Sequence, residues 1–166
     1  MKRLAILLLF SFVGILHSQH MDNDKLELII KKNADTLNGI PGNWKFIYKE
    51  TPMLCVTDKT NNRMRIISPI TSSDNLDKDL LLDAMTANFH SALDVKYAIT
   101  NKILWSVYIH PLKELTEEQV NSAISQVYYA ARTFGSTFSS TELIFGAGNT
   151  KKKSKEAIPE EKIRKF

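Results

Sequence analysis

The chain has 166 residues, a formal net charge of +4 and a single cysteine. Its length suits one domain with a hydrophobic core, and the lone cysteine excludes an intramolecular disulfide. The positive charge belongs to the end of the chain, since residues 151–166 carry a net +4 while residues 20–150 carry −2. A nearly neutral body argues against nucleic-acid binding, which needs a basic face on the domain itself.

Residues 1–19 predict a cleavable signal peptide. Two basic residues follow Met1, an apolar run spans residues 4–16, and the polar residues His17-Ser18-Gln19 come next. The apolar run is too short to span a bilayer comfortably. We therefore expect export to the periplasm or the extracellular space, followed by one domain over residues 20–148. An uncleaved N-terminal anchor is the alternative.

The exported part is expected to begin with a helix. Asp22 offers N-cap chemistry, and apolar residues recur at helical spacing as far as Leu37. Asn38-Gly39 is typical of a helix C-terminus, and Pro41-Gly42 predicts a turn.

Three strands are expected next. Aromatic residues alternate with other side chains over residues 44–48, which is strand periodicity, and Thr51-Pro52 predicts a turn. Further strands are expected over residues 53–57 and 63–68, the last ended by Pro69. Short links between consecutive strands favour an antiparallel meander.

The second half of the chain predicts a helix, a β-hairpin and a final helix. Ser72-Ser73-Asp74 is expected to open a helix with a broad apolar stripe, and Asn101-Lys102 is expected to join the two strands of the hairpin. The last helix begins at a capping box, Thr116-Glu-Glu-Gln119, and runs to about Phe134. Residues 137–145 fit either a short strand or a helical turn.

This order, α-β-β-β-α-β-β-α, predicts an α+β fold with a five-stranded antiparallel sheet and flanking helices. Together with a characteristic stretch in the second half, it resembles the type III secretion chaperone-like fold that YbjN-like domains share. The stretch comprises Asp94–Ile99, Ile103-Leu-Trp105, Pro111-Leu112 and Leu115–Glu118. The resemblance implies a non-catalytic domain that binds other polypeptides, often as a dimer, although chaperones of this kind work in the cytoplasm.

One face of the predicted sheet is a candidate binding surface. If Phe46, Tyr97, Trp105 and Val107 point toward the helices, alternation places three apolar side chains on the opposite face among lysines. These candidate binding residues are Ile47, Leu104 and Tyr108. A partner or a second subunit would cover such a face. Ordinary scatter of exposed apolar residues, or coverage by residues 137–145, is the alternative.

No catalytic or metal-binding constellation is evident, so we expect neither a cofactor nor a metal. A zinc site usually recruits three or four converging ligands, whereas His90, Asp94 and His110 are spread along the chain. The segment from Gly135 to Ser139 does not match the G-x-S-x-G pattern of a hydrolase nucleophile. Cys55 lies in an apolar run and is expected to be a buried thiol.

Residues 149–166 are expected to form a charged, disordered tail. Lys151, Lys152 and Lys153 are candidate contacts for anionic lipid or an acidic partner, and a simply solvated terminus is the alternative. The sequence as a whole favours an exported, non-catalytic protein-binding module, possibly a homodimer. A small envelope hydrolase or enzyme accessory protein with a dispersed site, and a peripheral membrane-surface protein, remain alternatives.

Overall fold

An antiparallel sheet of six strands organises the fold, with three α-helices packed beside it. The computed structural model describes residues 20–142, so the expected signal peptide at residues 1–19 and the expected tail at residues 149–166 lie outside the described residues. The elements in chain order are α2 (Asn23–Asn33), β1 (Thr36–Ile40), β2 (Asn43–Tyr48), β3 (Thr51–Asp58), β4 (Arg63–Ser72), a 3₁₀ turn (Ser73–Asn75), α3 (Lys78–His90), β5 (Lys96–Thr100), β6 (Ile103–His110) and α4 (Glu117–Thr133).

The predicted α+β class is confirmed, but the sheet has six strands rather than five because of β1. Helix α2 ends at Asn33 and not at Leu37, and the chain then enters β1, which pairs with β2. Gly39 is therefore a strand residue and not a helix cap. It has a φ of +132°, and a Cβ there would lie 2.2 Å from the Asn43 carbonyl oxygen, so a side chain would prevent this pairing.

The strands follow the order β1-β2-β3-β4-β6-β5 across the sheet. Two-residue turns join β2 to β3 and β5 to β6, and both residues of each turn have positive φ: Lys49 and Glu50, then Asn101 and Lys102. This geometry is that of a type I′ turn, whose twist suits antiparallel strands. The Asn101-Lys102 hairpin is as predicted, whereas Thr51-Pro52 belongs to β3 and is not the turn.

Strand β4 continues beyond Pro69, where the sequence predicted its end. The pairing of β3 with β4 stops at Leu54 and Ile67, so from Pro69 onward β4 pairs only with β6. Proline has no N–H and is tolerated where one edge of a strand is free. A register shift between Pro69 and Thr71 accompanies this change.

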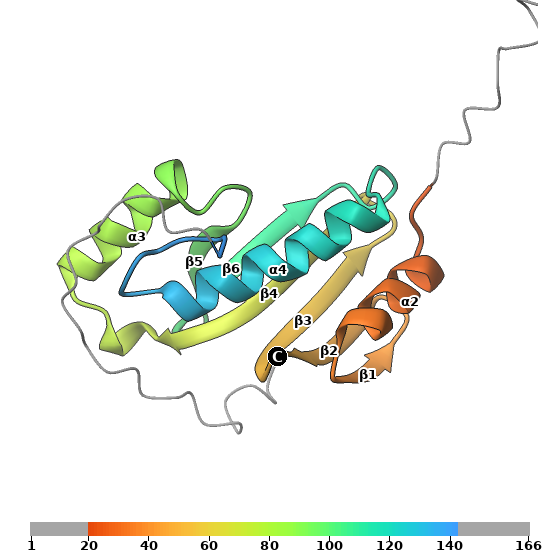
Figure 1. Ribbon diagram of the computed structural model, residues 1–166, viewed down its shortest axis with the longest axis horizontal. Coiled ribbons are helices and arrows are strands. Elements are labelled where there is room, and N and C mark those ends of the chain that lie inside the picture. The colour runs from red at the N-terminus through yellow and green to blue at the C-terminus, as the bar shows by residue number, and fades with distance from the viewer. Residues whose placement is uncertain (1–19, 143–166) are drawn as a thin grey trace, which may run out of the picture.

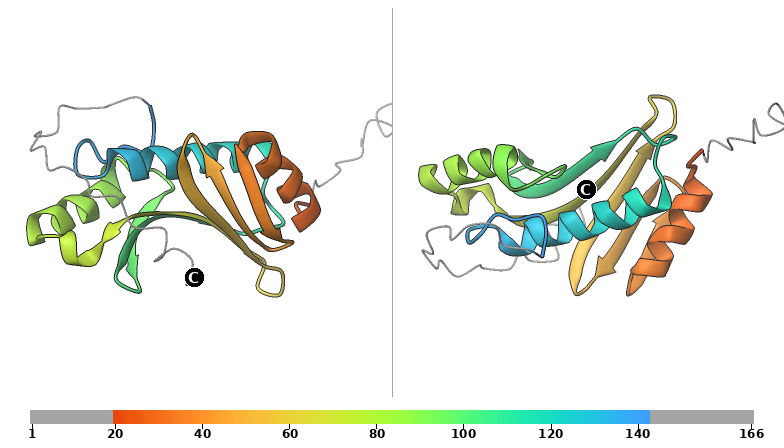
Figure 2. Two further views of the ribbon diagram at one scale, coloured as in Figure 1. Left: turned by 90° about the horizontal axis from the view of Figure 1, so that it is seen from below. Right: turned by 45° about the horizontal axis from the view of Figure 1, so that its top comes forward.

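Helix α4 lies across one face of the sheet, over β4 and β6, with α2 and α3 near its two ends (Figures 1 and 2). No described helix lies over the opposite face (Figure 2), which we call the helix-free face. The predicted capping box opens α4: Thr116 accepts from the N–H of Gln119, and the Gln119 side chain accepts from the N–H of Thr116. None of the helices in residues 20–142 has the length and apolar character needed to cross a bilayer.

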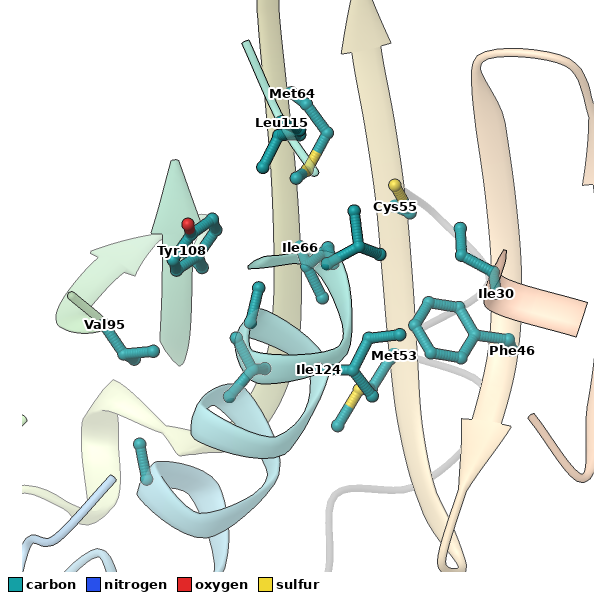
Figure 3. Close-up of a cluster of buried hydrophobic side chains, with 14 of the residues drawn as sticks. Ile30, Phe46, Met53, Cys55, Met64, Ile66, Val95, Tyr108, Leu115 and Ile124 are labelled. Carbon is teal, nitrogen blue, oxygen red and sulfur yellow. The ribbon is translucent and has the colours of Figure 1, made fainter. Parts of the chain in front are cut away.

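The hydrophobic core fills the space between the three helices and the sheet. Figure 3 shows side chains of α2, α4, several strands and the neighbouring loops converging there, among them Ile30, Phe46, Ile66 and Ile124. Cys55 is fully buried in this core, as expected, and burial raises the pKa of its thiol far above the usual value. A thiol in this setting packs as a small apolar side chain.

Candidate protein-binding surface

The side chains of β6 that face the helices are the ones that the sequence predicted to point away from them. Leu104, Ser106 and Tyr108 point into the core and are at most 5% exposed, whereas Trp105 and Val107 lie on the helix-free face. Leu104 and Tyr108 therefore do not form an exposed binding surface. Burial raises the pKa of the Tyr108 hydroxyl, which fits a position beneath the helices.

The reversal has a physical cause at Ser106. The strand carries large apolar residues on both faces, so alternation alone cannot decide which set faces the helices. The Ser106 hydroxyl donates a hydrogen bond of 3.0 Å to the Val127 carbonyl of α4, and a small side chain here lets the helix approach the sheet closely. The neighbouring Tyr97 hydroxyl donates to the Ala130 carbonyl at 3.0 Å.

Ile47 is the one predicted sheet-face residue that lies on the helix-free face. It is half-buried and lies opposite Thr36 and Pro52 in the neighbouring strands. Its role in binding stays a prediction. Lys151, Lys152 and Lys153, the predicted tail contacts, lie outside the described residues.

One exposed apolar surface lies on α3, the helix that the sequence predicted to carry a broad apolar stripe. Helix α3 buries only its alanines, Ala84 and Ala87. Four large apolar side chains on the helix and just after it face outward: Leu82 (54% exposed), Met85 (53%), Phe89 (87%) and Leu93 (54%). Leu82, Met85 and Phe89 follow at intervals of three and four residues, so they share one side of the helix, and Leu93 comes shortly after its end at His90. We call these four residues the α3 stripe.

A side-chain clamp fixes α3 beside β5. The side-chain nitrogen Nδ2 of Asn88 donates to the backbone carbonyl of Tyr97 at 3.3 Å. In return, the backbone N–H of Tyr97 donates to the side-chain oxygen Oδ1 of Asn88 at 2.7 Å. Asn88 thus takes the place of a neighbouring strand at this point of the sheet edge. The clamp blocks strand addition there and leaves the outer surface of α3 as the boundary of the molecule (Figure 1).

A second apolar surface is a groove of about 700 Å³ along α2. Its apolar lining comes from Met21, Leu28, Ile29 and Leu115, and lysines border it. Two of these lysines already have partners: Lys32 forms a 2.8 Å ion pair with Glu117, and Lys25 donates to the His20 carbonyl at 2.8 Å.

Three tyrosines surround the ammonium group of Lys49. Its nitrogen lies 5.3 Å, 5.4 Å and 5.9 Å from the ring centres of Tyr48, Tyr128 and Tyr129. Interaction with Tyr48 favours the charged form and raises the lysine pKa. This cluster connects the β2–β3 turn to α4. Sequence reasoning missed this cluster, because Tyr48 and Lys49 lie far along the chain from Tyr128 and Tyr129.

The histidines make local contacts. The His110 ring stacks on Tyr108, and its Nδ1 lies 2.8 Å from the Pro111 carbonyl oxygen, while the His90 ring meets Phe89 edge to face. Within residues 20–142, no three histidine, cysteine or acidic side chains lie close enough together to hold a metal ion.

No protein-family model and no curated protein matches this chain. Two solved structures have a similar fold. A chain of the HopA1–SchA chaperone–effector complex aligns with a TM-score of 0.52 at 11% identity, over 68% of this chain and 88% of that one. A chain of the ExsC–ExsE complex aligns with a TM-score of 0.52 at 12% identity, over 67% and 92%. The predicted type III secretion chaperone-like fold is thereby confirmed.

Proposed function

We propose that this chain is an exported, non-catalytic module that binds another polypeptide in the cell envelope or outside the cell. The α3 stripe is the observation that carries this proposal. Half of the large exposed apolar side chains of residues 20–142 belong to it, and they lie together on α3 and just after it rather than scattered over the surface. A contiguous apolar patch of this kind is typical of a protein interface.

The spacing of the stripe favours an amphipathic helix as the partner. Apolar residues at three- and four-residue intervals form a ridge that can fit into a groove on the surface of a second helix. Two exposed carboxylates, Asp79 and Asp83, fall beside the stripe on the same helix, so a partner helix with basic residues beside its apolar face is the best match. Fully burying one such side chain contributes roughly 1.5–3 kcal/mol, so covering all four favours association by several kcal/mol.

The fold supports a binding role without catalysis. One of the similar structures is a complex of a chaperone with its effector, and polypeptide binding is the activity that we carry over from it to this chain. Export is proposed from residues 1–19, whose basic start and short apolar run are typical of a signal peptide. Mass spectrometry of the protein from its native host tests export, and we expect a mature N-terminus near residue 20.

Photo-crosslinking in the native host tests the binding site. A photoreactive residue in place of Phe89 is expected to crosslink to another polypeptide, and the pair M85E/F89E is expected to abolish that partner's binding. Because both side chains are exposed, the pair should leave thermal unfolding nearly unchanged.

The control is I40E, which changes an equally apolar and exposed residue at the other end of the sheet, in β1. It should bind the crosslinked partner normally. Equal binding by M85E/F89E and the control would refute the proposed site.

A further inference from the structure

Three apolar side chains on the helix-free face are more deeply buried than the described elements explain. Leu54, Ile103 and Trp105 are 7%, 2% and 2% exposed, and Ile67 and Val107 pack against them. Side chains stand upright on a sheet, so their neighbours cover their sides but not their tips. No described helix lies over this face (Figure 2). Further chain above the sheet would account for the burial of the tip of this tryptophan.

Basic side chains surround this cluster. Cross-strand pairing places Lys45 opposite Leu54, Arg65 opposite Val56 and Lys96 opposite Val107, all on the helix-free face. None of these three forms an ion pair with a residue among 20–142. The chain that covers this face should therefore combine apolar side chains with carboxylates.

We propose that the covering segment is the C-terminal part of this chain, with residues 156–166 seated on the cluster. This stretch, Glu-Ala-Ile-Pro-Glu-Glu-Lys-Ile-Arg-Lys-Phe, has three glutamates within its first six residues and three basic residues after them (Lys162, Arg164 and Lys165), and its apolar residues include Ile158, Ile163 and Phe166. The glutamates meet the basic rim, and the apolar side chains cover Trp105. The segment thus forms a third layer that is opposite the helices.

The chain is long enough to reach this face. The described residues end at Glu142, shortly after Ser140, whose N–H donates to the Ser91 carbonyl at the end of α3. The fourteen residues from there to Glu156 can span up to about 45 Å. Five strand spacings of about 4.8 Å separate the two edges of a six-stranded sheet, so the segment can pass around either edge.

Fluorescence of Trp105 tests this proposal in the chain from residue 20 to 166. In a W44F background Trp105 is the only tryptophan, and the triple variant E156K/E160K/E161K, which places positive charge opposite the basic rim, should release the segment. We expect a red shift of the emission and a several-fold rise in the acrylamide quenching constant. Removal of residues 149–166 should produce the same change.

Trp44 serves as the control, because it is buried beneath α2 and its Nε1 donates to Glu27. In a W105F background, neither the triple variant nor the removal of residues 149–166 should alter the quenching of Trp44.

Three results would overturn the proposal. Trp105 quenching that is identical with and without the segment would mean that the sheet protects the ring unaided and that residues 149–166 are the solvated tail expected from composition. Protection that is lost on dilution of the full chain would assign the cover to a second copy. Protection that appears only after another polypeptide is added would assign the cover to a partner.

If W44F does not fold, ¹⁹F-tryptophan labelling of the otherwise unchanged chain gives the same readout. The W105F variant then identifies which resonance belongs to Trp105.

Discussion

Ser106 determines how closely the long helix approaches the sheet. It is fully buried opposite Ser68, which is also fully buried, and its hydroxyl is bonded to α4 at Val127. Two small residues side by side at the centre of the sheet make room for the helix backbone, and the hydrogen bond compensates for the burial of the hydroxyl.

Replacing this serine tests the role of the close approach. We expect S106V to lower the free energy of unfolding by about 1–3 kcal/mol, because the branched side chain crowds α4 and the hydrogen bond is lost. Urea unfolding measures the change. T100V, the same kind of substitution at an exposed position of β5, should alter stability by less than about 0.5 kcal/mol, and equal losses in both variants would contradict the packing argument.

Asn62 makes the stability of the β6–α4 connection depend on pH. Its side-chain amide donates to Glu114 at 2.8 Å, and its side-chain oxygen accepts from the Lys113 N–H at 2.9 Å. The bond from Asn62 lowers the pKa of the Glu114 carboxyl. A carboxyl whose pKa is lower in the folded state stabilises the fold above its unfolded-state pKa. This contribution is lost as the pH falls through the folded-state pKa.

The variant N62G tests this link, because glycine keeps the left-handed backbone of this position, where φ is 50°. We expect the pKa of Glu114, followed by ¹³C NMR titration, to rise toward its usual value. The Asp58 carboxyl, whose pKa is lowered by its bonds from Asn61, serves as the internal control and should keep its value. An unchanged Glu114 pKa would contradict the assigned cause.

At the scale of elements, α3 depends on few contacts for its position. It buries two alanines and packs mainly on β5, to which the Asn88 clamp joins it. An element with little buried apolar area opens more easily than the rest of a domain. The helix that carries the α3 stripe therefore depends on the Asn88 clamp for part of its orientation.

Hydrogen exchange of N88A measures this dependence. Loss of the amide leaves the Tyr97 N–H and carbonyl without their partner, so amides of α3 and β5 should exchange at least ten-fold faster, while α4 stays protected. The control N121A removes an asparagine of α4 that bonds to Asn33, and it should leave α3 unchanged. Equal protection of α3 in N88A and the parent chain would show that the clamp is not needed.

The elements also show which features the sequence could predict. The capping box at Thr116 and the hairpin at Asn101-Lys102 depend on neighbouring residues, and both were predicted. Strand β1 was missed because Leu37 continues the helical pattern of α2, and pairing with β2 overrides that pattern. The faces of β6 were reversed because both carry apolar residues, and only contact with α4 distinguishes them. The exposure of the α3 stripe depends equally on what lies beside the helix.

At the scale of the whole molecule, the three helices lie on one face of the sheet, with α3 at one end (Figure 2). The apolar side chains of the α3 stripe are exposed at that end. In the absence of the proposed partner, this patch can meet only solvent or a second copy of the chain. The Asn88 clamp disfavours pairing through the β5 edge, so self-association would proceed through packing of α3 against α3.

Light scattering of residues 20–166 measures this self-association. We expect the average mass to rise above that of a monomer with increasing concentration, because association buries the α3 stripe, and M85E/F89E should restore the monomer mass. The I40E control should associate like the parent chain. A monomer mass at all concentrations, in the parent chain as in the variants, would contradict association through α3.

The single thiol of the chain has a practical consequence. Cys55 is fully buried at the centre of the core, and its raised pKa keeps it protonated. A reagent such as dithionitrobenzoate can therefore modify it only while the whole sheet is open. The labelling rate in native buffer would report the frequency of global opening from one residue, without added denaturant. Under the proposed export to an oxidising compartment, the same accessibility would set how soon folding must hide the sulfur after translocation.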